Sequence, residues 1–284
     1  MKSEQEDKMQ LMQVLSEIML LNRDNGLKFT VDSRLERINT LLWNSRYRRL
    51  NAQGLFHLFG AKPLNEIEDP IILVSTHIDC IFDISKCFTR CEDDGLMRGT
   101  YDNAITNAAI LWLMLQGELP DNVLVAFTGD EEDDSQGAKQ VCRYFQSKRR
   151  KIACAVVLDA TNDGWKQQAD FTIENLFWNN DSAFGETVIE MAEQTGKRWF
   201  FVPESVSKIP SNLSAEKLIN HQAGFDESWE YGEDKIECFS MCLPVSGNMH
   251  SNSGVLARQE GFAKYTESLA FVLRSFAKTD NSEA

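Results

Sequence analysis

The sequence predicts an α/β fold built on a largely parallel sheet that helices cover on both faces. Two observations predict this class. Apolar runs of strand length alternate along the chain with amphipathic segments of helix length, which is the pattern of βαβ units. In addition, the run at residues 69–77 is apolar at successive positions, as expected of a strand that is buried on both faces.

Two amphipathic helices are predicted in the N-terminal region. Residues 6–22 repeat methionine, leucine and isoleucine at the spacing of one helical face. A second helix is expected from Asp32, a suitable N-cap residue, through Leu42.

The remaining elements follow in alternation. Besides the run already named, strands are expected at 54–62, 122–129, 151–161 and 236–247. Helices are expected at 107–116, 136–150, 181–196 and 262–276, with Gly196 as a C-cap. Residues 203–235 show no period and are rich in Pro, Ser, Asn and charge, which predicts a long surface loop. Because no repeat, low-complexity tract or linker divides the sequence, we expect one domain over residues 1–284.

Composition excludes several classes of partner. The 284 residues are 43% hydrophobic and 25% charged, which is ordinary for a globular protein with a sizeable core. A formal net charge of −14 would repel phosphate backbones and anionic lipid surfaces, so we expect neither nucleic acid nor a membrane as partner.

Compartment is predicted from two further features. The N-terminus "MKSEQEDKMQ" lacks the basic start and apolar block of a secretory signal, and no run approaches about 18 apolar residues, so a cytoplasmic location is expected. The seven cysteines lack paired CxxC spacing, which argues against a zinc ribbon or a disulfide framework.

Acidic and imidazole side chains follow the ends of the predicted strands. In chain order they are His77, Asp79, Asp102, Glu131, Glu132, Asp159 and His250. The carboxyl ends of parallel strands gather at one edge of a sheet. We therefore expect five separate segments of the chain to deliver these side chains to one crevice.

Each of these segments has a simpler interpretation when it is taken alone. The run "DEEDD" at residues 130–134 is typical of a solvated helix N-terminus, where acids suit the helix dipole. Asp159 alone is compatible with a turn cap, and His250 alone with a buried histidine. Only their joint position at strand ends favours a shared site.

Two histidines with several carboxylates are suitable ligands for zinc or a similar divalent ion. A carboxylate such as Asp102 can bridge two metal ions, and such pairs activate water and polarise a carbonyl or phosphoryl oxygen. The general base is then a neighbouring carboxylate that binds no metal. The adjacent Glu131 and Glu132 could divide these roles, one as ligand and one as base.

Five motifs in this order resemble those of a known family. The motifs "THID", "GTYDNA", "FTGDEEDDSQGA", "VVLDAT" and "NMHS" resemble the co-catalytic di-zinc exopeptidases, which include bacterial leucyl aminopeptidases and glutamate carboxypeptidases. The resemblance covers about residues 55–278. It implies a three-layer α/β/α sandwich with a mixed, largely parallel central sheet, and two divalent metal ions, with zinc as the implied metal.

The same resemblance implies a role for each residue. His77 and Asp159 would bind one metal, Glu132 and His250 would bind the other, and Asp102 would bridge the two. Glu131 would be the general base, and Asp79 would orient His77. The family commonly has a cis peptide after the bridging aspartate, so one is expected at Asp102–Asn103.

Spacing favours one branch of the family. Only residues 78–101 separate His77 from Asp102, which leaves no room for the domain that the branch forming tetrahedral shells inserts there. The interval from Asp159 to His250 is too short for a dimerising lid. The compact, lidless aminopeptidase-like branch fits best, although "CLPVSGNMHS" is closer to the tetrahedral-shell branch.

The leading functional prediction is a metal-dependent exopeptidase, an aminopeptidase that hydrolyses peptide bonds with a metal-bridging hydroxide and a glutamate general base. Its substrate would be a peptide or small amide. The substrate ammonium group could meet Asp226, Glu227 or Glu230, for which a solvated loop is the simpler interpretation. A homo-oligomer is compatible with the sequence.

Three alternatives remain open at this stage. The first is an amidohydrolase or carboxypeptidase acting on acylated amino acids or dipeptides with the same metals. It would need a cation for the substrate carboxylate, and Arg90, Arg98 and Lys208 are candidates. The others are a binding module that keeps the fold without catalysis and a single-metal cyclase, and the complete ligand set argues against both.

Overall fold

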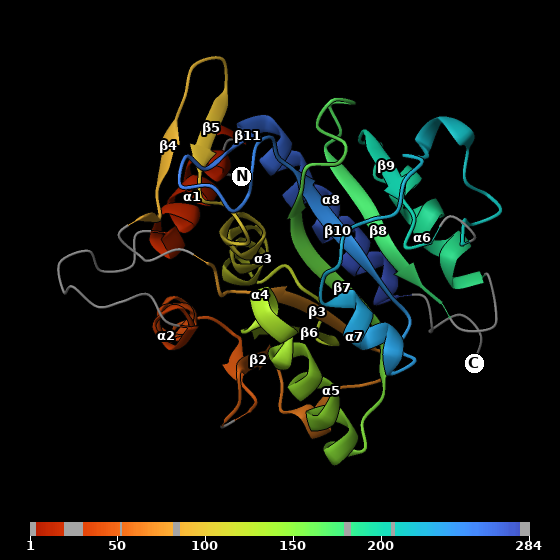
Figure 1. Ribbon diagram of the computed structural model, residues 1–284. Helices are drawn as coiled ribbons and strands as arrows, with labels where there is room; N and C mark the ends of the chain where they lie inside the picture. Colours follow the sequence, from red (N-terminus) through yellow and green to blue (C-terminus); the bar gives the residue numbers. More distant parts are fainter. Residues whose placement is uncertain are drawn as a thin grey trace.

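The protein is built around a central β-sheet (Figure 1). The structure is a computed structural model and describes residues 4–19, 31–51, 53–81, 86–178, 183–205 and 208–278. Within these residues the sheet has eight strands in the order β1-β2-β6-β3-β7-β10-β8-β9. The strands are β1 (Arg48–Arg49), β2 (Phe56–Gly60), β3 (Ile71–His77), β6 (Val123–Thr128), β7 (Ile152–Thr161), β8 (Phe171–Phe177), β9 (Trp199–Val202) and β10 (Cys238–Pro244).

The four middle strands of this sheet are parallel. β6, β3, β7 and β10 run in one direction, while β2 and β8 pair antiparallel on either side of them. The predicted mixed, largely parallel sheet is confirmed. Parallel neighbours need long crossovers, and the chain supplies them as helices between successive middle strands.

Helices form a layer on each face of the sheet (Figure 1). One layer contains α3 (Ala104–Gln116), α6 (Ala183–Gln194) and α8 (Gln259–Phe276), and the other contains α5 (Gln136–Lys148) and α7 (Ser228–Glu233). Two further helices, α1 (Glu4–Met19) and α2 (Val31–Leu42), pack outside α3. The three-layer α/β/α sandwich that the resemblance implied is therefore confirmed.

Strand alternation decides which face each site residue occupies. In β3, Val74 belongs to the apolar core shared with α3, whereas Leu73 belongs to the core shared with α5. Because side chains alternate with a period of two, His77 lies on the same face as Leu73, at the carboxyl end of the strand. Asp159 takes the corresponding face of the neighbouring β7. Two site residues are thus neighbours before any loop is considered.

A second, smaller sheet was not predicted. It contains β4 (Thr89–Cys91), β5 (Leu96–Gly99) and β11 (Val255–Arg258) in the antiparallel order β11-β5-β4. These strands have three or four residues each and carry charged side chains. Segments this short show too few alternations for a period to be recognised.

The prediction of a long surface loop at residues 203–235 is partly wrong. It includes α7, and this helix packs against β7, β8 and β10. A helix of six residues has less than two turns, so it leaves no visible period in the sequence. The region contributes buried residues to the face of the sheet on which His77 lies.

The helix boundaries mostly agree with the predictions. α2 begins at Val31, one residue before the predicted N-cap at Asp32, whose side chain lies outside the described residues. Gly196 follows α6 with a φ of 65°, as expected of a residue that ends a helix. Among the described helices, none has the length and apolar character needed to cross a membrane.

Candidate metal centre

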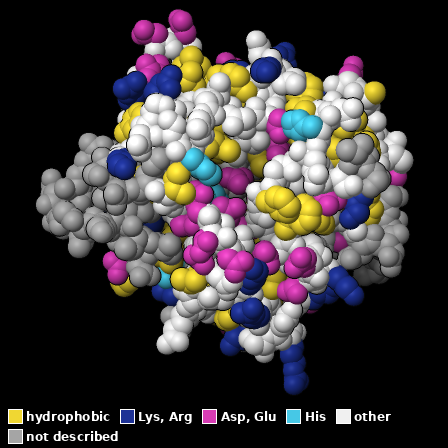
Figure 2. Space-filling model, in the orientation of Figure 1, with side chains coloured by type: hydrophobic (Ala, Val, Ile, Leu, Met, Phe, Trp, Pro, Cys, Tyr) yellow, Lys and Arg dark blue, Asp and Glu magenta, His cyan; other side chains and the backbone are white. Residues whose placement is uncertain are grey.

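The structure brings all seven predicted site residues to one edge of the sheet. They come from the end of β3, the start of α3, the short helix α4 (Glu131–Asp134) after β6, the end of β7 and the segment between β10 and β11. Figure 2 shows acidic side chains gathered around a central depression of this face, with a histidine at its edge. The expected crevice at the carboxyl ends of the strands is therefore present.

A first group of possible ligands consists of His77, Asp102 and Asp159. One ligand atom from each lies within 4.8 Å of the others. The Nε2 atom of His77 is 3.3 Å from Asp102 Oδ1 and 3.6 Å from Asp159 Oδ1. The imidazole is almost fully buried, and its two neighbours are held by their places in the fold, Asp159 on β7 and Asp102 just before α3.

A second group consists of Asp102, Glu132 and His250, again with ligand atoms within 4.8 Å of one another. His250 Nε2 is 3.5 Å from Asp102 Oδ2 and 3.4 Å from Glu132 Oε2. Asp102 is common to both groups and offers a different oxygen to each histidine. Its position is that of a carboxylate between two cation sites.

Asp79 supports both groups without belonging to either. Its Oδ1 is 3.4 Å from His77 Nδ1, on the side of the ring that faces away from Asp102. Its Oδ2 accepts a hydrogen bond of 3.1 Å from the backbone N–H of Glu132. A carboxylate in this place fixes the orientation of the imidazole and the start of α4 together.

Two asparagines of the α3 region were missed by the sequence reasoning. Asn107 Nδ2 donates to the carbonyl of His77 at 2.7 Å, and Asn103 Nδ2 donates to the carbonyl of Leu158 at 2.6 Å. These bonds tie the start of α3 to the ends of β3 and β7. The predicted cis peptide at Asp102–Asn103 is confirmed. The signal in the sequence is two asparagines at the start of a mainly apolar helix, one at its N-cap and one in its first turn.

The crowding of carboxylates perturbs their protonation. Burial raises the pKa of Glu132 to about 7, and it also raises the pKa values of Glu131 and Asp159. Burial opposes ionisation of Asp102 as well, but hydrogen bonds with His250 and His77 outweigh it and hold the pKa of Asp102 below its usual range. Carboxylates gathered in this way are stabilised by cations among them.

The donor set therefore fits two divalent ions. It contains two imidazoles and three carboxylates in two groups that share one member. Nitrogen and carboxylate oxygen are the ligands that zinc and similar ions accept. Glu131 is in neither group, although its Oε2 is 3.9 Å from His77 Nε2.

Two of the three candidate acids in the 203–235 region, Asp226 and Glu227, are buried, whereas Glu230 is half-buried. Glu227 is buried, and its Oε2 accepts a hydrogen bond of 2.8 Å from Ser75, whose Oγ in turn accepts one of 2.8 Å from Tyr231. Burial raises the pKa of Glu227 to about 7. Asp226 is buried too, and its Oδ1 accepts the backbone N–H of Ser228 at 2.9 Å. The solvated-loop interpretation is wrong for these two residues.

The three candidate cations for a substrate carboxylate have other partners. Arg90 and Arg98 both pair with Glu92, at 2.9 and 3.2 Å, on the small sheet. Lys208 lies over the ring of Phe177, 5.6 Å from its centroid, and 3.8 Å from Glu204. None of the three is part of the ligand groups.

Comparison with known proteins identifies the family. A family model described as peptidase family M28 matches residues 60–211, more than half of the chain. The chain belongs to peptidase family M28. This M28 membership confirms the resemblance drawn from the five motifs, and the matched span contains six of the seven site residues, all except His250. A search of the curated proteins found no match.

Solved structures of peptidases share the fold of this M28 chain. A TET aminopeptidase from the marine sediment archaeon Thaumarchaeota archaeon SCGC AB-539-E09 is 12% identical and has a TM-score of 0.66, covering 95% of this chain and 97% of its own. An aminopeptidase from the archaeon Desulfurococcus kamchatkensis is 10% identical with a TM-score of 0.65, covering 94% and 96%. A dinuclear metal-binding peptidase of family M20 from Bacillus subtilis is 12% identical with a TM-score of 0.61, covering 95% and 99%.

Proposed function

We propose that this M28 peptidase is an aminopeptidase that works with two divalent metal ions, zinc in the first instance. The observation that carries the proposal is the pair of ligand groups joined by Asp102. The structural neighbours support it, since two are described as aminopeptidases and a third as a dinuclear metal-binding peptidase. His77 and Asp159 would hold one ion, Glu132 and His250 the other, with Asp102 between them.

The protein side chains divide the remaining work. Metal ions at such a site, when bound, supply an acidified water and polarise the scissile carbonyl. Glu131 accepts the proton of the attacking water and returns it to the departing amine. Because Glu131 belongs to neither ligand group, its carboxylate is available to take up and release this proton.

The acidic character of the site favours a substrate with a free ammonium group. Bound metal would neutralise the ligand carboxylates, but Glu131, Asp79 and Asp226 are further acids near the centre, so a substrate cation is favoured there over a carboxylate. Arg90, Arg98 and Lys208 are engaged elsewhere, which removes the support for a carboxypeptidase or an N-acyl amidohydrolase. Recognition of a peptide N-terminus is the better fit.

Three broader expectations belong to the same proposal. The chain acts as a single catalytic domain without an inserted lid, and it works in the cytoplasm. It also assembles with further copies of itself, in line with a structural neighbour that forms a dodecamer in the asymmetric unit of its crystal and is 12% identical with a TM-score of 0.64. Size-exclusion chromatography with light scattering tests the assembly directly.

The experiment that tests the function compares free and blocked amino termini. Zinc-loaded protein is assayed on leucyl, alanyl and glutamyl p-nitroanilides and on their N-acetylated forms. We expect hydrolysis of the free forms only, and none by the Glu131→Gln variant. Release of the amino acid from N-acetyl-leucine or N-acetyl-glutamate, whose carboxylates are free, would instead establish the amidohydrolase alternative. Tight zinc binding with no hydrolysis of either set would favour a non-catalytic binding module.

A further inference from the structure

Two cysteines lie close together, one of them next in the chain to Asp79, which contacts the metal-ligand residues. The sulfur atoms of Cys80 and Cys87 are 4.0 Å apart and are not joined as a disulfide. Cys87 is buried and Cys80 is half-buried, so a small reagent can approach the pair from the side of Cys80. Cys80 follows Asp79 immediately in the chain, and Asp79 contacts both His77 and the start of α4.

A buried guanidinium completes the surroundings of the two thiols. Arg34 of α2 is 1% exposed, and its Nη1 donates to the carbonyl of Ile78 at 2.5 Å. Its positive charge is close enough to interact with Cys80, Cys87 and Asp79. A cation in this position stabilises a thiolate, which is the reactive form of cysteine.

The two thiols are not equivalent. The hydrogen bond between Cys87 and Cys80 raises the pKa of Cys87, and burial raises it further. Cys87 therefore keeps its proton and can donate it to the sulfur of Cys80. A half-buried sulfur that has a cation and a thiol donor beside it is the attacking member of an oxidisable pair.

We propose that Cys80 and Cys87 form a reversible disulfide with a small oxidised thiol, such as oxidised glutathione, as co-reactant. The Cys80 thiolate attacks one sulfur of oxidised glutathione and expels one glutathione thiolate, which takes up a proton. Cys87 then loses its proton, attacks the sulfur of Cys80 in the mixed disulfide and expels the second glutathione. Two electrons pass from the protein to oxidised glutathione, and two reduced glutathione molecules leave.

The disulfide would affect the metal centre through a single residue, Asp79. The two sulfurs must approach from 4.0 Å to a disulfide length of about 2.05 Å, and Cys80, the less buried of the two, has more room to shift. Asp79 is its chain neighbour, and displacing Asp79 loosens the support of His77 in one ligand group and of Glu132 in the other. Loss of such support typically weakens metal affinity about 10- to 100-fold. This consequence rests on the proposed function, whereas the bond itself does not.

The chemistry of the bond is tested on the full chain. Reduced, zinc-loaded protein is incubated with oxidised glutathione, and its intact mass and peptide map are measured. We expect the loss of two hydrogen atoms and a Cys80–Cys87 cross-link, reversed by a thiol reductant. Cys80→Ser and Cys87→Ser should each prevent it, while the matched control Cys91→Ser, an exposed cysteine on β4, should not. Stable glutathione adducts without the cross-link, or no reaction, would overturn the proposal.

The predicted effect of the disulfide on the metal centre is measured separately, as zinc retention. Zinc transfer to a colorimetric chelator is followed before and after oxidation, and we expect at least about 10-fold weaker retention in the oxidised protein. The Cys87→Ser variant should retain zinc after the same treatment. Unchanged retention in a fully cross-linked protein would contradict the coupling to the centre. A cross-link in protein that binds no metal in either state would uphold the thiol pair and overturn the proposed function.

Discussion

The Nε2 atom of His77 lies 3.3 Å from Oδ1 of Asp102, although one residue ends a strand and the other precedes a helix. The second oxygen of the same carboxylate faces His250 at 3.5 Å. One side chain therefore joins two groups of ligands, and both groups should depend on it. The first prediction follows from this shared position.

Replacing Asp102 by asparagine should reduce bound metal from two ions per chain to fewer than one. The amide has a single oxygen and no charge, so it cannot serve both groups. Elemental analysis of zinc-dialysed protein measures the result. Asp133→Asn is the matched control, because Asp133 is an exposed acid of α4 outside both groups. Two ions retained by Asp102→Asn would contradict the bridging role.

Replacing Glu131 by glutamine should lower kcat by about 100- to 10,000-fold while both metal ions stay bound. Glutamine keeps the size of the side chain and cannot take up a proton. Steady-state hydrolysis of a leucyl anilide and metal content are measured on the same preparation. A variant with normal kcat would rule out Glu131 as the general base, and a variant that lost metal would make it a ligand instead.

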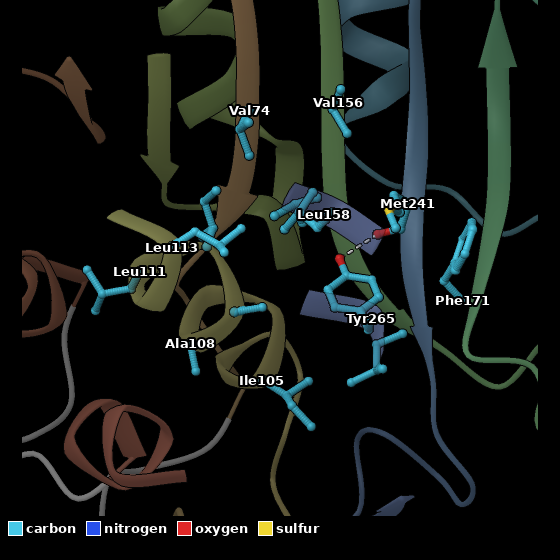
Figure 3. Packing of buried hydrophobic residues seen from close by; sticks show 14 of the residues in the cluster. Val74, Ile105, Ala108, Leu111, Leu113, Val156, Leu158, Phe171, Met241 and Tyr265 are labelled. Atoms are coloured by element: carbon cyan, nitrogen blue, oxygen red, sulfur yellow. Dashed lines mark hydrogen bonds between the residues drawn. The ribbon is translucent and has the colours of Figure 1, made fainter. Parts of the chain in front are cut away.

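Tyr265 of α8 supports the sheet through β10 (Figure 3). Its hydroxyl is buried and donates to the carbonyl of Met241 in β10 at 2.8 Å. Tyr265→Phe should lower the free energy of unfolding by about 1 kcal/mol, because a buried carbonyl loses a donor. Urea unfolding measures the change. Tyr144→Phe is the control, since its half-buried hydroxyl can be replaced by water; an equal loss in both variants would show that burial of Tyr265 is unimportant.

His57 should make stability depend on pH. Burial, with a smaller contribution from Arg49, lowers the pKa of this β2 histidine to about 4 from an ordinary value of 6.5. Between pH 6.5 and about 4 the unfolded chain therefore binds a proton at His57 that the folded chain does not bind. The contribution of the neutral histidine to the stability of the fold is complete above pH 6.5 and is lost as pH falls towards 4. Asn39 Nδ2 lies 3.1 Å from Nδ1, a position suited to donating to the neutral ring.

The measurement compares wild type with His57→Gln by urea unfolding at pH 7 and pH 5. Other titrating groups act in both proteins and cancel in the difference. Wild type should lose about 1–2 kcal/mol more than the variant over this interval. Parallel losses in the two proteins would show that the histidine titrates normally in the folded state.

The sequence predicted the strands that are continuous apolar runs, together with the polar residues that follow them. β3, β6 and β7 are continuous apolar runs, so both the strands and the acids or histidines after them were recognised. β8 was missed because it buries Glu174, and Thr172 donates to that carboxyl at 2.6 Å inside the strand. A buried acid interrupts the apolar pattern on which strand prediction depends.

The rest of the site depends on contacts that one sequence does not contain. The sequence alone does not distinguish Asn107, which donates to the carbonyl of His77, from an asparagine on a solvated helix face. The same is true of Glu227, whose partner Ser75 lies far away in the chain. These residues acquire their roles only when α3 and α7 pack on the sheet, so their discovery required the fold.

The number of metal ions per chain tests the central claim most directly. Protein stripped with a chelator is dialysed against zinc, and zinc and sulfur are measured together by elemental analysis. The account predicts two zinc ions per chain in the wild type. One ion would mean that the two groups around Asp102 do not act as a pair, and none would contradict a metal centre altogether.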